Sequence, residues 1–372
     1  MRTWSHRVIP ACLAALAACG HSEPFAATDH DLDRPLIAGE PVQLTYGGGS
    51  GPAWLLDESQ VVYAGRRLVG DSRDVCLNFL RAGGGTVQRQ ICNAGLADGG
   101  MVDSFASPTV AADQRLGFVH LSAPAGGPLV AAVYAASLAQ PDSRVALRTI
   151  PFLGSDGAFY VEAWSPRWLG AGEIAFLGVA QEQHDPCAGC DPILVTYART
   201  IFRAGMGAPG TAAPVPGITF ATSFTVGESG DVLYLTLPGD SRILRYVLST
   251  GGSETVHDFG PAGIARDVHY AAGRLAAIVG GKVLVYPDDI GPLQTGDQGG
   301  HLYLVDTGTG EERRLSDDTQ WYRHPALSPT GSALAAEGFA VSFVDPSDPF
   351  APPGAVDTLI AGVGNIWVFG SP

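Results

Sequence analysis

The fold is decided by the stretch Arg323-His324-Pro325-Ala326-Leu327-Ser328-Pro329-Thr330-Gly331-Ser332-Ala333-Leu334-Ala335-Ala336, because its pattern recurs along the chain. A proline begins a short extended run, a polar turn follows, and a small apolar strand comes next. Five further turns align with Gly331 at spacings of 43 to 58 residues, at Glu58, Gln114, Gly172, Gly230 and Gly273. A recurring period of this length indicates a repeat architecture and outweighs local propensities.

An apolar run of strand length begins two residues after each turn. The six runs are rich in Val, Leu, Ile and aromatic residues and are bounded by Gly, Pro and Asp, which is typical of strands; they span residues 60–63, 116–119, 174–177, 232–235, 275–279 and 333–336. One such unit cannot bury its own apolar face, so the repeats must pack against one another. We therefore expect an all-β chain forming a six-bladed β-propeller of four-stranded antiparallel blades.

The repeat resembles that of TolB-like propellers, which carry WD40-like (PD40-type) repeats. In that family a Pro, a Ser-Pro-Asp-Gly-type turn and an apolar strand recur. The best match runs from Pro325 to Ala336, with Ser328-Pro329-Thr330-Gly331 at the turn, and residues 52–63 match with Leu55-Leu56-Asp57-Glu58 in its place. The resemblance covers roughly residue 40 to the C-terminus and implies a fold, not an activity.

The N-terminal strand is expected to close the ring. Residues 42–45 precede Pro52 in the same way that residues 313–316 precede Pro325. We expect residues 313–316 to form the outermost strand of the preceding blade. With no blade before it, segment 42–45 should complete the last blade beside residues 365–369. This pairing would remove an exposed sheet edge.

The N-terminus has the pattern of an export signal. Arg2 and Arg7 precede the apolar stretch 8–18, which is too short for a transmembrane helix. The signal ends Leu16-Ala17-Ala18-Cys19-Gly20, which resembles a bacterial lipobox. The resemblance implies a lipoprotein signal peptide at residues 1–18, lipid on Cys19, a tether at 19–39 and the propeller at 40–372. Alternatively, Cys19 lies near an ordinary signal-peptidase site.

Location and partners follow from this N-terminus and from charge. Lipid on a cysteine without a following Asp favours the outer membrane, on its periplasmic or its surface face. The formal net charge of −15 repels phosphate backbones and anionic head groups, so nucleic acid is not an expected partner. We expect a monomer that contacts the membrane only through its lipid and binds an envelope protein or a glycan.

Two cysteine pairs predict disulfides in an exported chain. Cys76 and Cys92 flank a glycine turn centred on residue 84, so they should face each other across a hairpin, within the range that a disulfide accepts. Cys187 and Cys190 form a Cys-x-x-Cys pair that we interpret as a small loop disulfide. The alternative is zinc ligation with His184, but the chain has no second such pair and we predict no metal site.

Candidate ligand-binding residues are sought in the loops that join each outer strand to the next inner strand, because propellers usually bind at one mouth of the channel. The polar and aromatic members of these loops are Asp103, Glu162, Arg266, Asp267, Trp321, Arg323 and His324. Such a set is able to bind a peptide or sugar through charge-assisted hydrogen bonds and stacking.

We therefore predict a lipid-anchored binding or scaffold module without catalytic residues or cofactor. The alternative is a propeller hydrolase or lyase, which needs a carboxylate pair or a histidine-based acid and base in the mouth. Asp103 or Glu162 with His324 is the combination that the sequence offers. No Gly-x-Ser-x-Gly elbow and no phosphate-binding Gly-x-x-x-x-Gly-Lys motif occurs in the chain.

Overall fold

The computed structural model describes residues 40–66, 68, 75–92, 102–123, 130–149, 152–153, 159–160, 162–170, 172–184, 193–285, 298–318, 320–343, 358–361 and 364–370. Apart from one short 3-10 helix, Gly260–Ala262, the regular elements of these residues are β-strands. Within this part of the chain, no helix has the length and apolar character needed to cross a bilayer.

Four antiparallel sheets each contain four consecutive strands. The first sheet contains β2 (Ser50–Trp54), β3 (Gln60–Arg66), β4 (Val75–Arg81) and β5 (Arg89–Ile91). The second contains β6 (Val102–Val110), β7 (Arg115–Ala123), β8 (Val130–Ser137) and β9 (Val145–Thr149). The third contains β12 (Glu162–Gly170), β13 (Glu173–His184), β14 (Ile193–Gly205) and β15 (Ala213–Pro214). The fourth contains β16 (Ser223–Val226), β17 (Val232–Thr236), β18 (Arg242–Val247) and β19 (Ser253–Asp258).

The remaining strands form a nine-stranded sheet and one small hairpin. The large sheet contains β20 (Ala265–Ala271), β21 (Arg274–Val285), β22 (Gln298–Asp306), β23 (Glu312–Arg314), β24 (Gln320–Leu327), β25 (Ala333–Phe343), β26 (Thr358–Ala361), β27 (Asn365–Gly370) and β1 (Pro41–Gln43). Strand β26 pairs parallel with β21 and antiparallel with β25. The hairpin consists of β10 (Phe152–Leu153) and β11 (Phe159–Tyr160).

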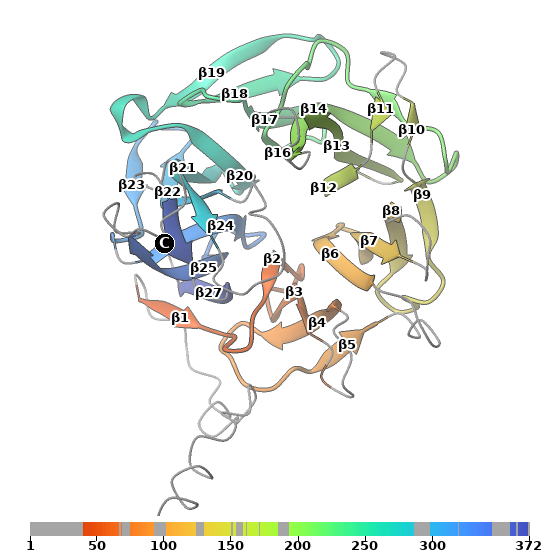
Figure 1. Ribbon diagram of the computed structural model, residues 1–372, viewed down its shortest axis with the longest axis horizontal. Coiled ribbons are helices and arrows are strands. Elements are labelled where there is room, and N and C mark those ends of the chain that lie inside the picture. Colours follow the sequence, from red (N-terminus) through yellow and green to blue (C-terminus); the bar gives the residue numbers. More distant parts are fainter. Residues whose placement is uncertain are drawn as a thin grey trace, which may run out of the picture.

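The sheets lie side by side around a common centre, and the first strand of each series lies innermost (Figure 1). These inner strands contact one another in sequence: β2 with β6, β6 with β12, β12 with β16, β16 with β20, β20 with β24, and β24 with β2. Repeated four-stranded antiparallel sheets in this arrangement are the architecture of a β-propeller. The predicted TolB-like, WD40-like propeller is thus confirmed at the level of fold.

The predicted turn alignment is visible in the backbone. All six turn positions have a positive φ: Glu58 56°, Gln114 64°, Gly172 93°, Gly230 68°, Gly273 77° and Gly331 70°. Glycine adopts this conformation without steric cost, which explains why four of the six positions are glycine. At Glu58 the side chain compensates, because its carboxylate accepts hydrogen bonds from Thr330 N at 2.6 Å and Ser332 Oγ at 2.8 Å.

Apolar side chains fill the spaces between neighbouring sheets. Leu77 and Phe79 of β4 pack in one cluster with Phe105 of β6 and Phe118 of β7. Further clusters join the third sheet to the fourth, and the fourth to strands β20–β22. Because burying a side chain such as Leu or Phe stabilises by about 1.5 to 3 kcal/mol, each sheet depends on its neighbours.

The two ends of the described chain pair with each other. In the antiparallel register of β1 and β27, Pro41 lies opposite Phe369 and Val42 opposite Val368. Leu44 N continues the ladder by donating to Ile366 O at 2.7 Å. The predicted pairing of residues 42–45 with residues 365–369 is therefore present, and Figure 1 shows β1 along the outer side of β27.

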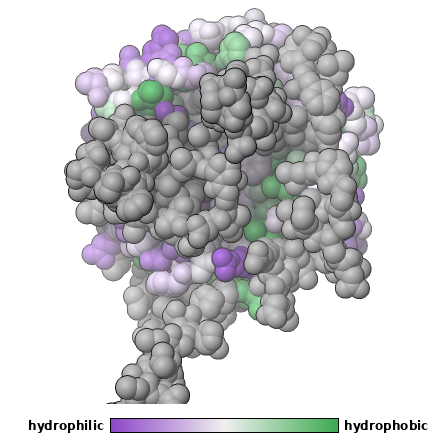
Figure 2. All heavy atoms as spheres, in the orientation of Figure 1, coloured by the Kyte–Doolittle hydropathy of each residue, from purple (hydrophilic) through white to green (hydrophobic). Residues whose placement is uncertain are grey.

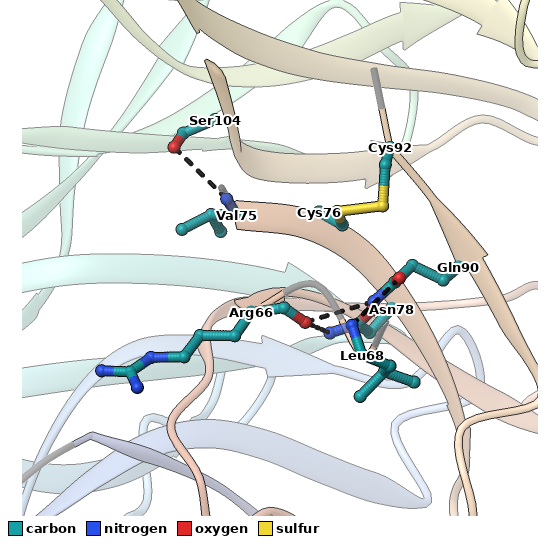
Figure 3. The surroundings of a disulfide bond; sticks show 8 residues. All are labelled: Arg66, Leu68, Val75, Cys76, Asn78, Gln90, Cys92 and Ser104. Carbon is teal, nitrogen blue, oxygen red and sulfur yellow. Dashed lines mark hydrogen bonds between the residues drawn. A yellow bond between two sulfur atoms is a disulfide. The ribbon is translucent and has the colours of Figure 1, made fainter. Parts of the chain in front are cut away.

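The disulfide between Cys76 and Cys92 is present, with a Cα–Cα distance of 4.7 Å (Figure 3). Cys76 lies in β4 and Cys92 directly follows β5, so the bond crosses the predicted hairpin. Beside it, Gln90 Nε2 donates to Asn78 Oδ1 at 2.6 Å, and Asn78 donates to Arg66 O at 3.3 Å. The other cysteine predictions, for Cys19, Cys187 and Cys190, lie outside the described residues.

Replacing Leu44 with alanine should destabilise the protein, because Leu44 is 6 % exposed and packs with Trp54 and Ile366 where the chain ends meet. We expect the free energy of unfolding to fall by about 2 to 4 kcal/mol in urea denaturation of the full-length chain. Val145→Ala is the matched control, since Val145 is 37 % exposed, and it should change stability by less than about 0.5 kcal/mol. Equal effects of the two substitutions would contradict a structural role for this junction.

Candidate ligand-binding site at the inner strands

Five of the seven predicted site residues have described side chains, and all five lie on inner strands. Arg266 and Asp267 belong to β20, and Trp321, Arg323 and His324 belong to β24. The expectation that they lie in loops is wrong, because the strands begin earlier than the repeat pattern indicates. For Asp103 and Glu162 the structure describes only the backbone, which pairs with Ser122 and Val179.

Five of the six inner strands contain a β-bulge. The register shifts between Ser50 and Ala53, Ala106 and Thr109, Trp164 and Arg167, Arg266 and Val268, and Arg323 and Ala326. Each shift contains one residue with positive φ, namely Gly51 55°, Ser107 48°, Ser165 48°, Asp267 35° and His324 50°. A non-glycine residue in this conformation costs of order 1 kcal/mol or more, and such strain is concentrated at functional sites.

The recurring prolines of the sequence lie in these bulges. Pro52, Pro108, Pro166 and Pro325 directly follow a positive-φ residue. Proline has no N–H to donate, so it is accommodated where the ladder is interrupted. In these four strands, the residue before the proline therefore marks the position of the bulge in the sequence.

Asp267 and His324 are bulge residues of neighbouring inner strands, and they contact each other. His324 N donates a hydrogen bond to Asp267 Oδ2 at 3.1 Å, and His324 Nδ1 lies 3.5 Å from the same oxygen. At the opposite edge of the imidazole ring, His324 Nε2 lies 3.9 Å from Glu337 Oε2. The imidazole is therefore flanked by two carboxylates.

Arg323 forms a bidentate ion pair with Glu337 of β25. Arg323 Nε donates to Glu337 Oε2 at 3.0 Å, and a terminal nitrogen donates to Oε1 at 2.9 Å. The two side chains are 13 % and 3 % exposed, and the guanidinium carbon lies 4.8 Å from the centre of the Phe339 ring. Buried charges need such pairing. Sequence reasoning missed Glu337, although a single acid within the apolar run of β25 is a usable signal.

Arg167 of β12 and His269 of β20 were also missed. Burial lowers the pKa of Arg167 to about 10, and the negative charge of Asp267 opposes that shift. Burial, together with the positive charge of Arg167, lowers the pKa of His269 to about 3. His269 is consequently neutral at physiological pH, and its Nδ1 accepts a hydrogen bond from Leu327 N at 3.1 Å.

The side chains of Arg266 and Trp321 contact other groups of the protein. Burial lowers the pKa of Arg266, which Asp267 opposes, and its Nε donates to Gly280 O at 3.2 Å. Trp321 is 6 % exposed, and its ring centre lies 5.0 Å from that of His301. The expected stacking role of Trp321 therefore does not fit this structure, because the ring is packed in the interior.

The cluster is mixed in charge and built on strands, which suits recognition through directed hydrogen bonds. In Figure 2 the coloured residues of this face include both hydrophilic and apolar ones along the outer edge, and a group of apolar residues lies between the grey parts. Within the described part of the chain, no group of three or more His, Cys, Asp or Glu residues is arranged to hold a metal ion.

No protein-family model and no curated protein matches the chain. Among solved structures, TolB from Acinetobacter baumannii is 12 % identical, with a TM-score of 0.47, and the match covers 83 % of this chain and 63 % of TolB. The β-propeller domain of Cps50 (Swd1) from Myceliophteria thermophila is 12 % identical, with a TM-score of 0.47 and coverages of 90 % and 100 %. A putative gluconolactonase is 14 % identical, with a TM-score of 0.48 and coverages of 91 % and 93 %.

Removing one partner of the Arg323–Glu337 pair should be more harmful than removing both. Glu337→Leu removes the carboxylate partner of a buried guanidinium, so we expect the free energy of unfolding to fall by about 3 to 5 kcal/mol. The double variant Arg323→Met, Glu337→Leu should lose less than the single variant. Glu254→Gln is the control, because Glu254 is 65 % exposed in its ion pair with Arg245 and should give no measurable change. Strictly additive losses in urea denaturation would refute the coupling.

Proposed function

We propose that the chain is a non-catalytic binding or scaffold module of the bacterial cell envelope, built on a six-bladed propeller. Six blades result if the nine-stranded sheet is divided into β20–β23 and the series β24, β25, β27 and β1. Each part then has four strands, like the other sheets. In this interpretation β1 supplies the outermost strand of the last blade and closes the ring, and β26 lies between the last two blades.

The observation that carries the binding function is that charged groups on the inner strands β20 and β24 are already paired within the protein. Arg323 is paired with Glu337, and Asp267 accepts a hydrogen bond from the backbone of His324. A general base must be free to reach a substrate proton, whereas these carboxylates already serve the protein. His269 is a poor base because its pKa is about 3. Preoriented charged groups whose carboxylates are already paired within the protein favour recognition over turnover.

An envelope protein or a glycan is the partner class that we propose. Both present hydrogen-bonding groups that mixed charged side chains on rigid strands recognise through charge-assisted hydrogen bonds. The net charge of −15 disfavours nucleic acid.

The second candidate function is a hydrolase or lyase, and one contact favours it. His324 is flanked by Asp267 at 3.5 Å and Glu337 at 3.9 Å, and a carboxylate that orients an imidazole is a recurring feature of acid and base catalysis. The predicted combination of His324 with Asp103 or Glu162 stays a prediction, because the structure describes only the backbone of these two acids.

A pair of histidine variants tests the binding function. His324→Asn is chosen because asparagine tolerates a left-handed backbone, and His257→Asn is the control, since His257 pairs with Glu312 at 2.7 Å on the surface. We expect the wild type and the control to retain an envelope protein or glycan after crosslinking in envelope extracts, and His324→Asn to lose it. Equal retention by all three would contradict the proposal. Turnover of a glycan, lactone or peptide that disappears only in His324→Asn would establish the enzyme instead.

Membrane attachment through Cys19 is a separate part of the proposal. A multiply acylated cysteine holds a protein on a membrane face because each buried CH₂ contributes about 0.8 kcal/mol. We expect palmitate labelling of the wild type in a bacterial host and loss of labelling in Cys19→Ala, with the variant released into the soluble fraction. Cys12→Ala, at a cysteine within the apolar stretch of the signal, is the control and should remain labelled. Unlabelled, soluble wild type would refute the anchor.

A further inference from the structure

A cavity of about 400 Å³ lies between the first and second sheets. Its lining comes from β3, β4, β5 and the chain next to them, and from the turns that follow β6 and β8. The apolar lining residues Leu55, Phe79 and Leu138 pack in one cluster. Pockets that bind small molecules have volumes of about 300 to 1,000 Å³ and a largely apolar lining, so this cavity suits a small ligand.

Arg89 connects the two sheets at the cavity. One of its terminal nitrogens donates to Leu138 O at 2.7 Å, and its guanidinium carbon lies 5.5 Å from the centre of the Phe79 ring. These two contacts hold the guanidinium against the cavity lining. Its remaining N–H groups make no hydrogen bond to the described residues, so they are available as donors.

Three glutamines also line the cavity, and their amides keep hydrogen-bonding capacity. The amides of Gln60 and Gln114 make no hydrogen bond within the described part of the chain. Gln88 Nε2 donates to Thr86 O at 2.8 Å, which leaves Gln88 Oε1 as an acceptor. Because an amide group has two N–H donors and a carbonyl acceptor, the cavity offers donors and acceptors together. A matching ligand must carry both.

The charge of the lining favours a neutral ligand. None of the lining residues is an acid, so a cation finds no carboxylate there. Of the acids in the neighbouring turns, which are Asp57, Glu58, Asp113 and Asp142, none lines the cavity, and the first three are engaged by donors of the protein. An anion meets three amide oxygens and a chain whose net charge is −15.

A sugar ring fits this chemistry better than a peptide does. An extended peptide is recognised through a row of backbone groups at a free strand edge, whereas the polar groups here are side chains around a compact cavity. Each sugar hydroxyl is both a donor and an acceptor, as the amides require. The C–H groups of the ring can pack against apolar side chains such as Leu55 and Leu138.

We infer that the cavity between the first two sheets is a binding site for one neutral sugar ring, held by Gln60, Gln88, Arg89 and Gln114. The inference goes beyond the proposed function, because none of these residues belongs to the polar cluster of β20, β24 and β25. It assigns a second site with its own ligand class.

Saturation-transfer NMR titration of the full-length protein tests the inference. The probes are the methyl glycosides of glucose, galactose, mannose and N-acetylglucosamine, together with sorbitol and N-acetyl-alanyl-alanine amide. We expect saturable binding of at least one glycoside with a Kd of about 1 mM. Sorbitol has the hydroxyls without the ring, so it should bind at least about tenfold more weakly than the preferred glycoside, and so should the peptide.

Variants of the lining locate the bound sugar. Gln60→Ala and Gln114→Ala each remove an amide and should weaken binding about threefold to tenfold, whereas Gln140→Ala, at an exposed residue outside the lining, should leave it unchanged. Ala139 is exposed and lines the cavity, so Ala139→Trp should occupy the space and abolish binding. Ala112→Trp, at an exposed residue outside the lining, is its matched control.

Four results would overturn the inference: no saturable binding of any glycoside, equal binding of sorbitol, preference for the peptide, or full binding by Ala139→Trp. Should Gln60→Ala or Gln114→Ala fail to fold, Ala139→Trp decides the question, because it changes an exposed residue. His324→Asn should bind the glycoside like the wild type. Partner retention that depends on His324, without glycoside binding, would leave the proposed function standing and refute the sugar site alone.

Discussion

Mutual burial of sheet faces is the constraint on which the rest of this structure depends. A four-stranded sheet with apolar residues on both faces is unstable alone in water, so it requires a neighbour on each side. The clusters that join Leu77 and Phe79 to Phe105, and Leu177 to Phe224, satisfy this need from one sheet to the next. Because every sheet is oriented by its neighbours, the inner strands are brought to a common centre. The packing between sheets, at a distance from this centre, therefore determines where the polar residues of the inner strands lie.

The polar centre is a product of local interruptions in that packing. The side chains of a regular strand alternate between two apolar interfaces, so few of its positions can hold a charged side chain. The bulges at Asp267 and His324 insert one residue and change the direction of the chain, so that a carboxylate and an imidazole of adjacent strands meet. Arg323 stays within the regular ladder opposite Glu337, which explains why it forms an ion pair with that strand neighbour.

The sequence predicted the repeat well because the turn has strict backbone requirements. The alignment on Gly331 located all six left-handed turn residues, including the non-glycine Glu58 and Gln114. The repeat also anticipated the pairing of residues 42–45 with the C-terminal strand, and the glycine turn centred on residue 84 anticipated the bond between Cys76 and Cys92. The site was predicted less well. Arg323, His324 and Asp267 lie in the polar cluster of the inner strands, but Trp321 is buried, and Arg167, His269 and Glu337 were missed because they lie within apolar strands. Side chains that meet across a centre are separated by whole blades in the chain, so local patterns carry no information about their contacts.

The pairing of β1 with β27 also has a mechanical consequence. Pro41 is the first residue of β1, so tension on the preceding chain acts first on the ladder between Val42 and Val368. Leu44 and Trp54 lie in one cluster with Ile366, and the indole of Trp54 donates to Ala326 O at 2.8 Å. Strand β1 lies at the edge of its sheet beside β27, so force from the N-terminal side acts on this edge ladder, which the packing of Leu44 with Trp54 and Ile366 reinforces.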